Sequence, residues 1–327
     1  MIRRPPRSTP KPSSAASDVY MRHYQNLSVA DGIQSNNPWL QEMPDPISKV
    51  CWDNYISVNP KDAEKLNIET GDMTVGIAAG VEDMFSIPMG GFNPDFHPQL
   101  AEQEYDISMG ETAENLAEEG HIPRTDQEDF AVGSHQKALD AWANGRFDNE
   151  IIPIDVYGEA TVEKDEGPRE PDLEKIKSLN PAFLENGTIT PATSSPISIG
   201  ASAVLITSRK FAEDNGLTIR SAISSRSVTG VDWRKMGMGP LPATEKALKQ
   251  AGLTMDNVDV IELNEAFAAQ SLYVIQQGNW DQSKINLNGG AIALGHPLGC
   301  SGARIITTLL NVMEPVSYTH LTLPTKA

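Results

Sequence analysis

The most constraining feature of this chain is a run of small residues that fixes a histidine between a glycine and a proline. The run reads N-G-G-A-I-A-L-G-H-P-L-G-C-S-G-A-R over residues 288–304, and N-E-A-F-A-A-Q precedes it over residues 264–270. Glycine allows close backbone approach, and proline biases the residue before it toward extended geometry. His296 is therefore predicted to be held in one place, where another group can come close to it.

An asparagine opens the earlier of these two motifs and follows an apolar run. Residues 258–263 predict a strand that ends at Asn264. In α/β folds, ligands lie beyond the carboxyl ends of strands. The amide there and the His296 imidazole could jointly bind an oxyanion, or the water that stabilises one. A helix-capping asparagine and a structural histidine are the alternatives, because spacing alone does not bring the two side chains together.

The glycine-rich run raises two further possibilities. A phosphate-binding loop is not supported, because the run contains neither G-x-x-x-x-G-K-[ST] nor G-x-G-x-x-G. Cys300 lies among small residues near a predicted helix start, where a thiol can have a lowered pKa. The favoured interpretation is that Cys300 is a small packing residue.

Composition places the chain among soluble globular proteins of up to two domains. The 327 residues are 39% hydrophobic and 21% charged, and no apolar run approaches the length of a membrane span. The net charge of -18 repels polyanions, so nucleic acid and anionic membrane are not expected as partners.

Cysteine and histidine positions predict neither a disulfide nor a metal site. The two cysteines, Cys51 and Cys300, lie in unrelated contexts, which favours a reducing, intracellular setting. The other histidines share no ligand-like spacing: His23, His97, His121, His135 and His320. No bound metal is therefore expected.

Alternating strand, loop and helix signals predict an α/β fold. A short buried strand is expected over residues 73–82 and a further strand over residues 201–208. One helix is expected over residues 242–251, with a proline near its start and Gly252 just past its end. Another is expected over residues 299–313, with apolar side chains facing the core.

A long polar insertion spans residues 83–191 and carries much of the acidic charge. Thr125 and Glu128 predict a capping box at the start of a helix that stops at Gly145. Apolar side chains at helical spacing support that helix: Phe130, Ala131, Ala138, Ala141 and Trp142. The insertion is therefore expected to be structured.

The two ends of the chain and the segment after its start differ in texture from the rest. M-I-R-R-P-P-R-S-T in residues 1–16 and V-S-Y-T-H-L-T-L-P-T-K-A in residues 315–327 resemble translated sequencing adaptors, so both are set aside. A transit peptide is the alternative for the basic start, although prolines oppose an amphipathic helix. Residues 17–71, with W-D-N-Y and N-P-K-D-A-E-K-L, resemble part of the C-terminal domain of molybdopterin oxidoreductases. A join of two unrelated genes is expected near residues 71–73.

Six motifs, in order and spacing, resemble those of the thiolases. They are G-V-E-D-M at 80–84, S-M-G-E-T-A-E-N at 108–115, P-A-T-S-S-P at 191–196, M-G-M-G-P-L-P-A at 236–243, and the two motifs described first. The resemblance covers residues 72–314 and is strongest to the degradative 3-ketoacyl-CoA thiolases of fatty-acid β-oxidation. It implies a layered α-β-α-β-α fold, incomplete at both ends. It divides the chain into the end of an N-terminal half with its loop insertion, residues 72–200, and a truncated C-terminal half, residues 201–314.

The resemblance implies a two-step acyl transfer. A cysteine thiolate attacks a 3-ketoacyl-CoA, acetyl-CoA leaves, and a second CoA removes the shortened acyl group. His296 matches the histidine that activates the nucleophile and helps to form an oxyanion hole, and Asn264 matches the asparagine that holds the water completing it. Met109, Ser195, Ala266 and Phe267 match positions that line the pantetheine and acyl channel. CoA is then a substrate, with no bound cofactor. A homodimer or homotetramer is implied, in the bacterial cytoplasm or in a eukaryotic mitochondrion or peroxisome.

Both cysteines that carry this chemistry in the family lack a match here. The nucleophile stands in a C-G-S-G or C-x-S-S context upstream of residue 72, where only V-C-W-D-N-Y occurs, and Cys51 lacks small neighbours. The second cysteine, in a C-x-G segment, would follow Glu314. No nucleophile is identified, so the chain is predicted to be inactive. An acetoacetyl-CoA thiolase, a non-catalytic CoA- or acyl-binding protein, and a molybdopterin oxidoreductase fragment remain as alternatives.

Overall fold

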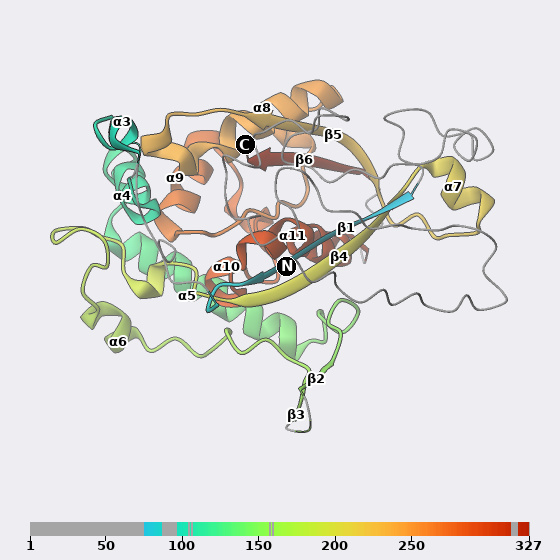
Figure 1. Ribbon diagram of the computed structural model, residues 1–327, viewed down its shortest axis with the longest axis horizontal. Coiled ribbons are helices and arrows are strands. Elements are labelled where there is room, and N and C mark those ends of the chain that lie inside the picture. The colour runs from blue at the N-terminus through green and yellow to red at the C-terminus, as the bar shows by residue number, and fades with distance from the viewer. Residues whose placement is uncertain are drawn as a thin grey trace, which may run out of the picture. The chain divides into compact units, whose positions relative to one another are not determined.

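The computed structural model describes residues 75–86, 97–103, 105, 107–156, 158, 160–314 and 320–326 (Figure 1), all within one compact unit, Met73–Ala327. The strands are β1 Val75–Asp83, β2 Ile154–Val156, β3 Ala160–Val162, β4 Ile199–Thr207, β5 Ala222–Thr229 and β6 His320–Lys326. The α-helices are α3 Pro98–Ala101, α4 Met109–Glu119, α5 Arg124–Ala143, α6 Leu173–Ser178, α7 Arg209–Asp214, α8 Pro240–Ala251, α9 Ala268–Gly278, α10 Ala291–Leu294 and α11 Leu298–Met313. Short 3-10 helices are η1 Pro191–Thr193, η2 Trp233–Met238, η3 Met255–Asn257 and η4 Gln282–Lys284.

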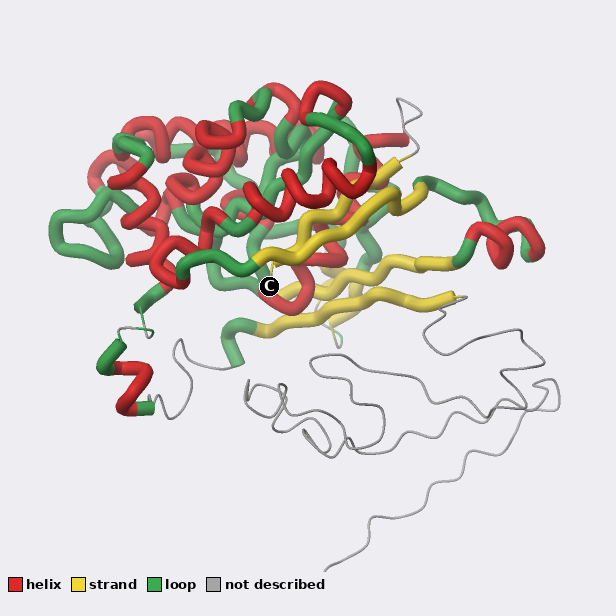
Figure 2. Tube along the Cα trace, turned by 90° about the horizontal axis from the view of Figure 1, so that it is seen from above, coloured by secondary structure: helices red, strands yellow, loops and turns green. Residues whose placement is uncertain are grey.

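The strands form three two-stranded sheets. β1 pairs antiparallel with β4, from Val75 opposite Thr207 to Asp83 opposite Ile199, and β2 forms a short hairpin with β3. β5 runs parallel to β6. The helix α11 packs on the β1–β4 sheet and α8 packs on β5. Figure 2 shows the helices stacked mainly on one side of the strands, which confirms the predicted α/β class.

Helix ends follow local chemistry, with one correction. α4 starts at a capping box in which the Ser108 side chain accepts from the Glu111 N–H and the Glu111 carboxylate accepts from the Ser108 N–H. α8 begins at Pro240, two residues before the predicted start, and ends at Ala251, with Gly252 as its C-cap in the left-handed region (φ 70°), as predicted. The capping box predicted at Thr125 is wrong, because α5 already begins at Arg124 and has no side-chain cap.

Two strand predictions also need correction. The strand expected over residues 258–263 forms only an isolated bridge between Ile261 and Ile285. Beyond that bridge, the Asn286 side chain takes the place of a neighbouring strand, as described below. β1 was expected to be buried, yet Ile77 and Val81 are 72% and 73% exposed. Its sheet has two strands with α11 on one face, so alternate residues point away from the helix.

The core lies under the segment that carries Asn264. One cluster joins buried side chains of α9, the residues before it and the loop after it: Leu263, Val274, Ile275, Trp280 and Ile285. The apolar face predicted for residues 299–313 belongs to α11, where Met313 is buried. Packing therefore fixes Leu263, the residue before Asn264. The G-H-P turn, residues 295–297, leads directly into the start of α11. Among the described helices, none is long and apolar enough to cross a membrane.

Candidate active site

The structure brings Asn264 and His296 together. The amide Nδ2 of Asn264 lies 3.3 Å from the imidazole Nε2 of His296, although the two residues are 32 positions apart. Asn264 stands at the end of the extended segment that packs on the core, and His296 stands between α10 and α11. The sequence spacing left open whether these two side chains meet, and in the structure they do.

The backbone around His296 explains why small residues precede it. Gly295 adopts φ 94° and ψ 160°, and a Cβ on it would lie 2.5 Å from the Ser198 hydroxyl oxygen. A side chain at this position would be both strained and obstructed. Pro297 then forms the N-cap of α11. The turn therefore holds His296 against the start of that helix.

A serine of α11 orients the imidazole. Nδ1 of His296 lies 2.6 Å from Ser301 Oγ, and the Ser301 hydroxyl donates to the Pro297 carbonyl at 2.9 Å. Because the serine hydrogen is used on that carbonyl, its oxygen accepts from Nδ1–H. In the neutral imidazole, Nε2 is then the basic nitrogen that accepts from the Asn264 amide. The Oδ1 atom of Asn264 is buried and accepts no hydrogen bond.

The four residues predicted to line an acyl channel also gather in one region. The Ser195 N–H donates to the Ala266 carbonyl at 3.0 Å, and Ser194 forms an isolated bridge with Phe267. Met109 opens α4 and is 49% exposed. The first two contacts join the segment after η1 to the N-E-A-F segment that carries Asn264.

An aromatic residue absent from the sequence prediction completes this group. The Phe183 ring meets Phe267 edge to face, with centroids 5.6 Å apart. A Cβ on Gly110, next to Met109, would lie 2.0 Å from the same ring. Phe183 therefore links the start of α4 to the N-E-A-F segment. Its only local signal is P-A-F in a polar loop, which by itself predicts nothing.

Cys300 is a packing residue. Its side chain is 2% exposed in the first turn of α11, and burial raises the pKa of its thiol. The lowered pKa considered for it is therefore wrong. Cys51 lies outside the described residues. Within the described parts of the chain, no group of three or more His, Cys, Asp or Glu side chains could hold a metal ion.

A carboxyl group with an enclosed oxygen that accepts no hydrogen bond stands two residues before Asn264. Glu262 is partly exposed, but its Oε1 is enclosed and accepts no hydrogen bond. Burial raises the pKa of Glu262 to about 8, against the opposing charge of Arg304, and the nearby Glu265 carboxyl acts in the same direction as burial. Ionising Glu262 therefore costs free energy in the folded state.

Replacing this carboxyl group should stabilise the protein at alkaline pH. The pKa of this group in the folded state, about 8, lies above its ordinary value of 4.5. The free-energy cost of ionising it in the folded protein is therefore absent below pH 4.5, grows as the pH rises and is complete above about pH 8. We expect Glu262→Gln to raise the free energy of unfolding by about 2 kcal/mol at alkaline pH, a value discounted for partial exposure. Urea unfolding at several pH values measures this. An equal gain at acidic pH would contradict it.

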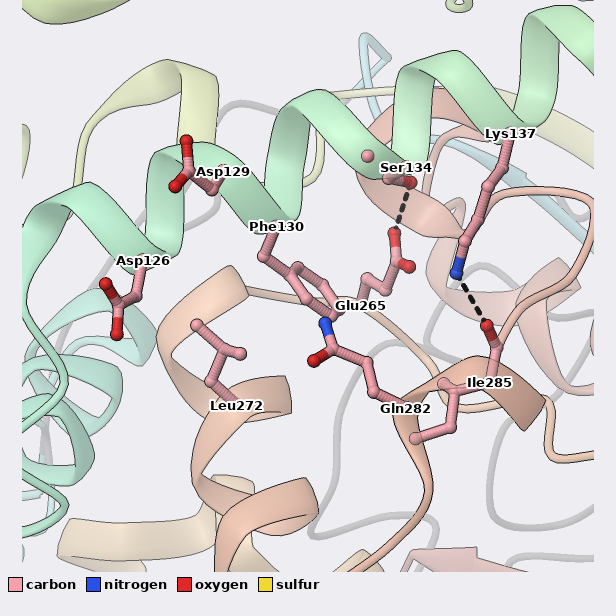
Figure 3. Close-up of a pocket in the computed structure, with 10 residues that line it drawn as sticks. Asp126, Asp129, Phe130, Ser134, Lys137, Glu265, Leu272, Gln282 and Ile285 are labelled. Atoms are coloured by element: carbon pink, nitrogen blue, oxygen red, sulfur yellow. Dashed lines mark hydrogen bonds between the residues drawn. The ribbon is translucent and has the colours of Figure 1, made fainter.

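A separate cavity of about 320 Å³ lies between α5, α9 and η4 (Figure 3). Its lining comprises Asp126, Asp129, Phe130, Gly133, Ser134, Lys137, Glu265, Leu272, Gln282 and Ile285. Glu265 is the one member of the N-E-A-F motif that lines it, and neither Asn264 nor His296 does. The cavity is therefore distinct from the Asn264–His296 site.

Taken together, a basic imidazole nitrogen meets an amide, and the segment that carries the amide also carries Phe267, whose ring packs on Phe183. An amide and an imidazole that meet in this way are the groups an acyl-transfer site uses to bind an oxyanion. The family model for the thiolase N-terminal domain matches residues 47–210, and that for the thiolase C-terminal domain matches residues 217–322. The chain therefore belongs to the thiolase family. These matches extend beyond residues 72–314 on both sides.

Individual relatives agree with the family assignment. The chain is 45% identical over 306 residues to the 3-ketoacyl-CoA thiolase of Aliivibrio fischeri, covering 89% of this chain and 78% of the relative. It is 51% identical over 258 residues to that of Shewanella loihica, covering 76% and 66%. Against the crystal structure of human mitochondrial 3-ketoacyl-CoA thiolase, the TM-score is 0.68 at 36% identity, covering 74% and 66%. For the dimeric peroxisomal thiolase of Saccharomyces cerevisiae, the TM-score is 0.69 at 37% identity, covering 77% and 65%. The fold is thus thiolase-like, and the chain spans from about two thirds to about four fifths of these relatives.

Proposed function

We propose that this chain carries the oxyanion-binding and acyl-CoA-binding part of a 3-ketoacyl-CoA thiolase. The parent reaction is the thiolytic cleavage of 3-ketoacyl-CoA to acetyl-CoA and a shortened acyl-CoA, as in fatty-acid β-oxidation. The contact between Asn264 and His296 is the observation that carries the proposal. We infer that the polypeptide binds these substrates without completing the cycle, because Cys300 is buried in α11 and Cys51 lacks the small neighbours of the family's nucleophile.

The proposed roles follow from the hydrogen-bond directions at the site. Nε2 of His296 is the basic nitrogen, so it can take the proton of an attacking thiol. Once protonated, Nε2 no longer accepts from the Asn264 amide, so the imidazolium N–H and that amide N–H, whose nitrogens lie 3.3 Å apart, are both left to donate to a substrate oxygen beside them. A carbonyl oxygen placed there would gain donors as the attack pushes negative charge onto it. Met109, Ser195, Ala266 and Phe267, together with Phe183, would hold the thioester arm beside it.

The other proposed properties come from the relatives. The human enzyme has been solved in a complex with CoA, and the yeast enzyme is a dimer. We infer CoA and acyl-CoA as ligands, with no bound cofactor, and a homodimer or homotetramer. The sequence relatives are bacterial, which favours the cytoplasm of a bacterium, with a mitochondrion or peroxisome as the eukaryotic equivalent. Neither nucleic acid nor a membrane is a proposed partner.

Two alternatives stay within the same family. An acetyl-CoA acetyltransferase of Bacillus anthracis resembles this chain as closely in structure, with a TM-score of 0.68 at 36% identity. The 3-ketoacyl-CoA type is preferred because the sequence relatives carry that name. A non-catalytic acyl-CoA-binding protein would keep the channel and lose turnover.

Binding of acetyl-CoA tests the proposal. We expect calorimetric titration of the purified chain to detect binding, and Phe267→Ala to weaken it about tenfold, because an aromatic anchor of the channel is lost. Phe211→Ala is the matched control, since Phe211 belongs to α7 rather than to the channel. A folded chain that binds no acetyl-CoA would overturn the proposed function. An equal loss of acetyl-CoA affinity in both variants would show that Phe267 is not part of the proposed binding channel.

A further inference from the structure

A buried carboxyl group connects the elements that carry the two site residues. Glu265 is 2% exposed and accepts three hydrogen bonds. They come from Ser134 Oγ of α5 at 2.6 Å, from Asn286 Nδ2 at 2.7 Å and from the Ile292 N–H of α10 at 3.2 Å. Figure 3 shows Glu265 pointing toward Ser134 across the wall of the cavity. Three separate segments therefore meet at this carboxylate.

The Asn286 partner clamps the backbone next to Asn264. Its amide Nδ2 donates to the Leu263 carbonyl at 2.8 Å, and its Oδ1 accepts from the Leu263 N–H at 2.7 Å. Asn286 is 1% exposed and adopts φ 47°, a conformation that asparagine tolerates better than most residues. Its side chain thus imitates a neighbouring strand, and its bond to Glu265 keeps the amide in that orientation.

The Ser134 and Ile292 partners fix the approach to His296. Ser134 Oγ accepts from the Gly290 N–H at 3.0 Å while it donates to Glu265. Gly290 and Ile292 are the N-cap and the second residue of α10, which spans only four residues and ends one residue before Gly295. The start of this short helix is therefore tied to the Glu265 carboxylate, and its end leads directly into His296.

We infer that Glu265 is a positioning residue that sets Asn264 and His296 at their mutual distance. It holds the Asn264 side through Asn286 and the His296 side through Ser134 and α10. This inference rests on the proposed function, in which those two residues form the oxyanion-binding pair. The Glu265 carboxylate hydrogen-bonds to neither the Asn264 side chain nor the His296 ring. It acts through its own partners, which are Ser134, Asn286 and the Ile292 N–H.

The test reads the imidazole of His296 directly. Long-range proton–nitrogen NMR of the full chain with labelled histidine distinguishes the Nδ1–H from the Nε2–H tautomer of a neutral ring. His296→Gln assigns the signal. We expect the parent chain to show the Nδ1–H form, and Glu265→Ala to shift the population toward Nε2–H because the Asn264 amide is no longer held on Nε2.

Glu114 provides a matched control. It is another buried carboxylate, 6% exposed, and it accepts hydrogen bonds from the Thr188 N–H, the Thr188 hydroxyl and the Ile189 N–H, all at 2.9 to 3.0 Å. Glu114→Ala should lower stability and leave the His296 signals unchanged. A merely structural Glu265 would behave in the same way, so unchanged His296 signals in folded Glu265→Ala would overturn the inference.

A milder variant covers the case in which Glu265→Ala does not fold. Ser134→Ala removes one donor to Glu265 and the acceptor of the Gly290 N–H, and it should move the same signals in the same direction by a smaller amount. Unchanged signals in that variant would also overturn the inference. The tautomer readout needs no substrate, whereas the proposed function fails if acetyl-CoA does not bind, so the two failures are distinguishable.

Discussion

A polypeptide of this sequence, mixed with a 3-ketoacyl-CoA and CoA, is expected to release acetyl-CoA at least about a thousandfold more slowly than an intact thiolase. The reaction needs a thiolate that attacks the keto carbonyl and then carries the acyl group. Cys300 cannot serve, because it is buried in α11 and its thiol pKa is raised by burial. If Cys51 does not supply that thiolate, no negative charge develops on the substrate oxygen for the proposed oxyanion site to stabilise.

Chromatographic measurement of acetyl-CoA checks this expectation, with the Aliivibrio fischeri 3-ketoacyl-CoA thiolase assayed in parallel. Retained binding of acetyl-CoA excludes the trivial explanation that the chain is unfolded. Turnover close to that of the relative would overturn the prediction. If that turnover disappeared in Cys51→Ser but persisted in Cys300→Ser, Cys51 would be identified as the nucleophile.

The fold was predictable from sequence where chemistry is local. The end of α8 follows from Gly252, which acts within one turn, whereas its start was placed two residues late because Pro240 rather than Pro242 is its first residue. The start of α5 was not predictable, because the Thr125 and Glu128 pattern predicts a first helical residue at Asp126 and the helix begins two residues earlier, at Arg124. Glu128 instead pairs with Arg124 at 2.7 Å.

The strand at residues 258–263 shows a different limit. Its apolar pattern reports burial, and Leu263 is indeed buried, but a strand also needs a partner along its whole length. Among residues 258–263 only Ile261 forms a β-bridge, and the Asn286 side chain supplies the hydrogen bonds at Leu263. A sequence pattern on one segment cannot reveal whether a second segment pairs with it.

The site divides in the same way. Asn264 and His296 could be singled out because each stands in a distinctive motif, but their spacing left open whether they meet, and the structure places their side-chain nitrogens 3.3 Å apart. Phe183, Ser134 and Asn286 could not be singled out, since their contacts join segments far apart in the chain. The bond from Ser134 to Glu265, for instance, spans 131 positions. A serine in the middle of a helix carries no local sign of that partner.

The glycine before α10 should be the most sensitive small residue in this network. A Cβ on Gly290 would lie 2.1 Å from the carboxyl carbon of Glu265. Gly290 has φ -130° and ψ -161°, which alanine can adopt, so the effect of Gly290→Ala comes from the contact and not from backbone strain. The Glu265 carboxylate can move away only by giving up its buried hydrogen bonds. We expect a loss of about 3–5 kcal/mol in the free energy of unfolding.

Urea unfolding measures this loss, and Gly133→Ala is the matched control. Gly133 lies inside α5, where a Cβ would meet no heavy atom within 4 Å, so alanine there should be neutral or stabilising by up to about 1 kcal/mol. A double-mutant cycle identifies the cause. In a Glu265→Ala background the obstruction is gone, so Gly290→Ala should cost much less than in the parent chain. An equal cost in both backgrounds would show that the Gly290 requirement does not arise from Glu265.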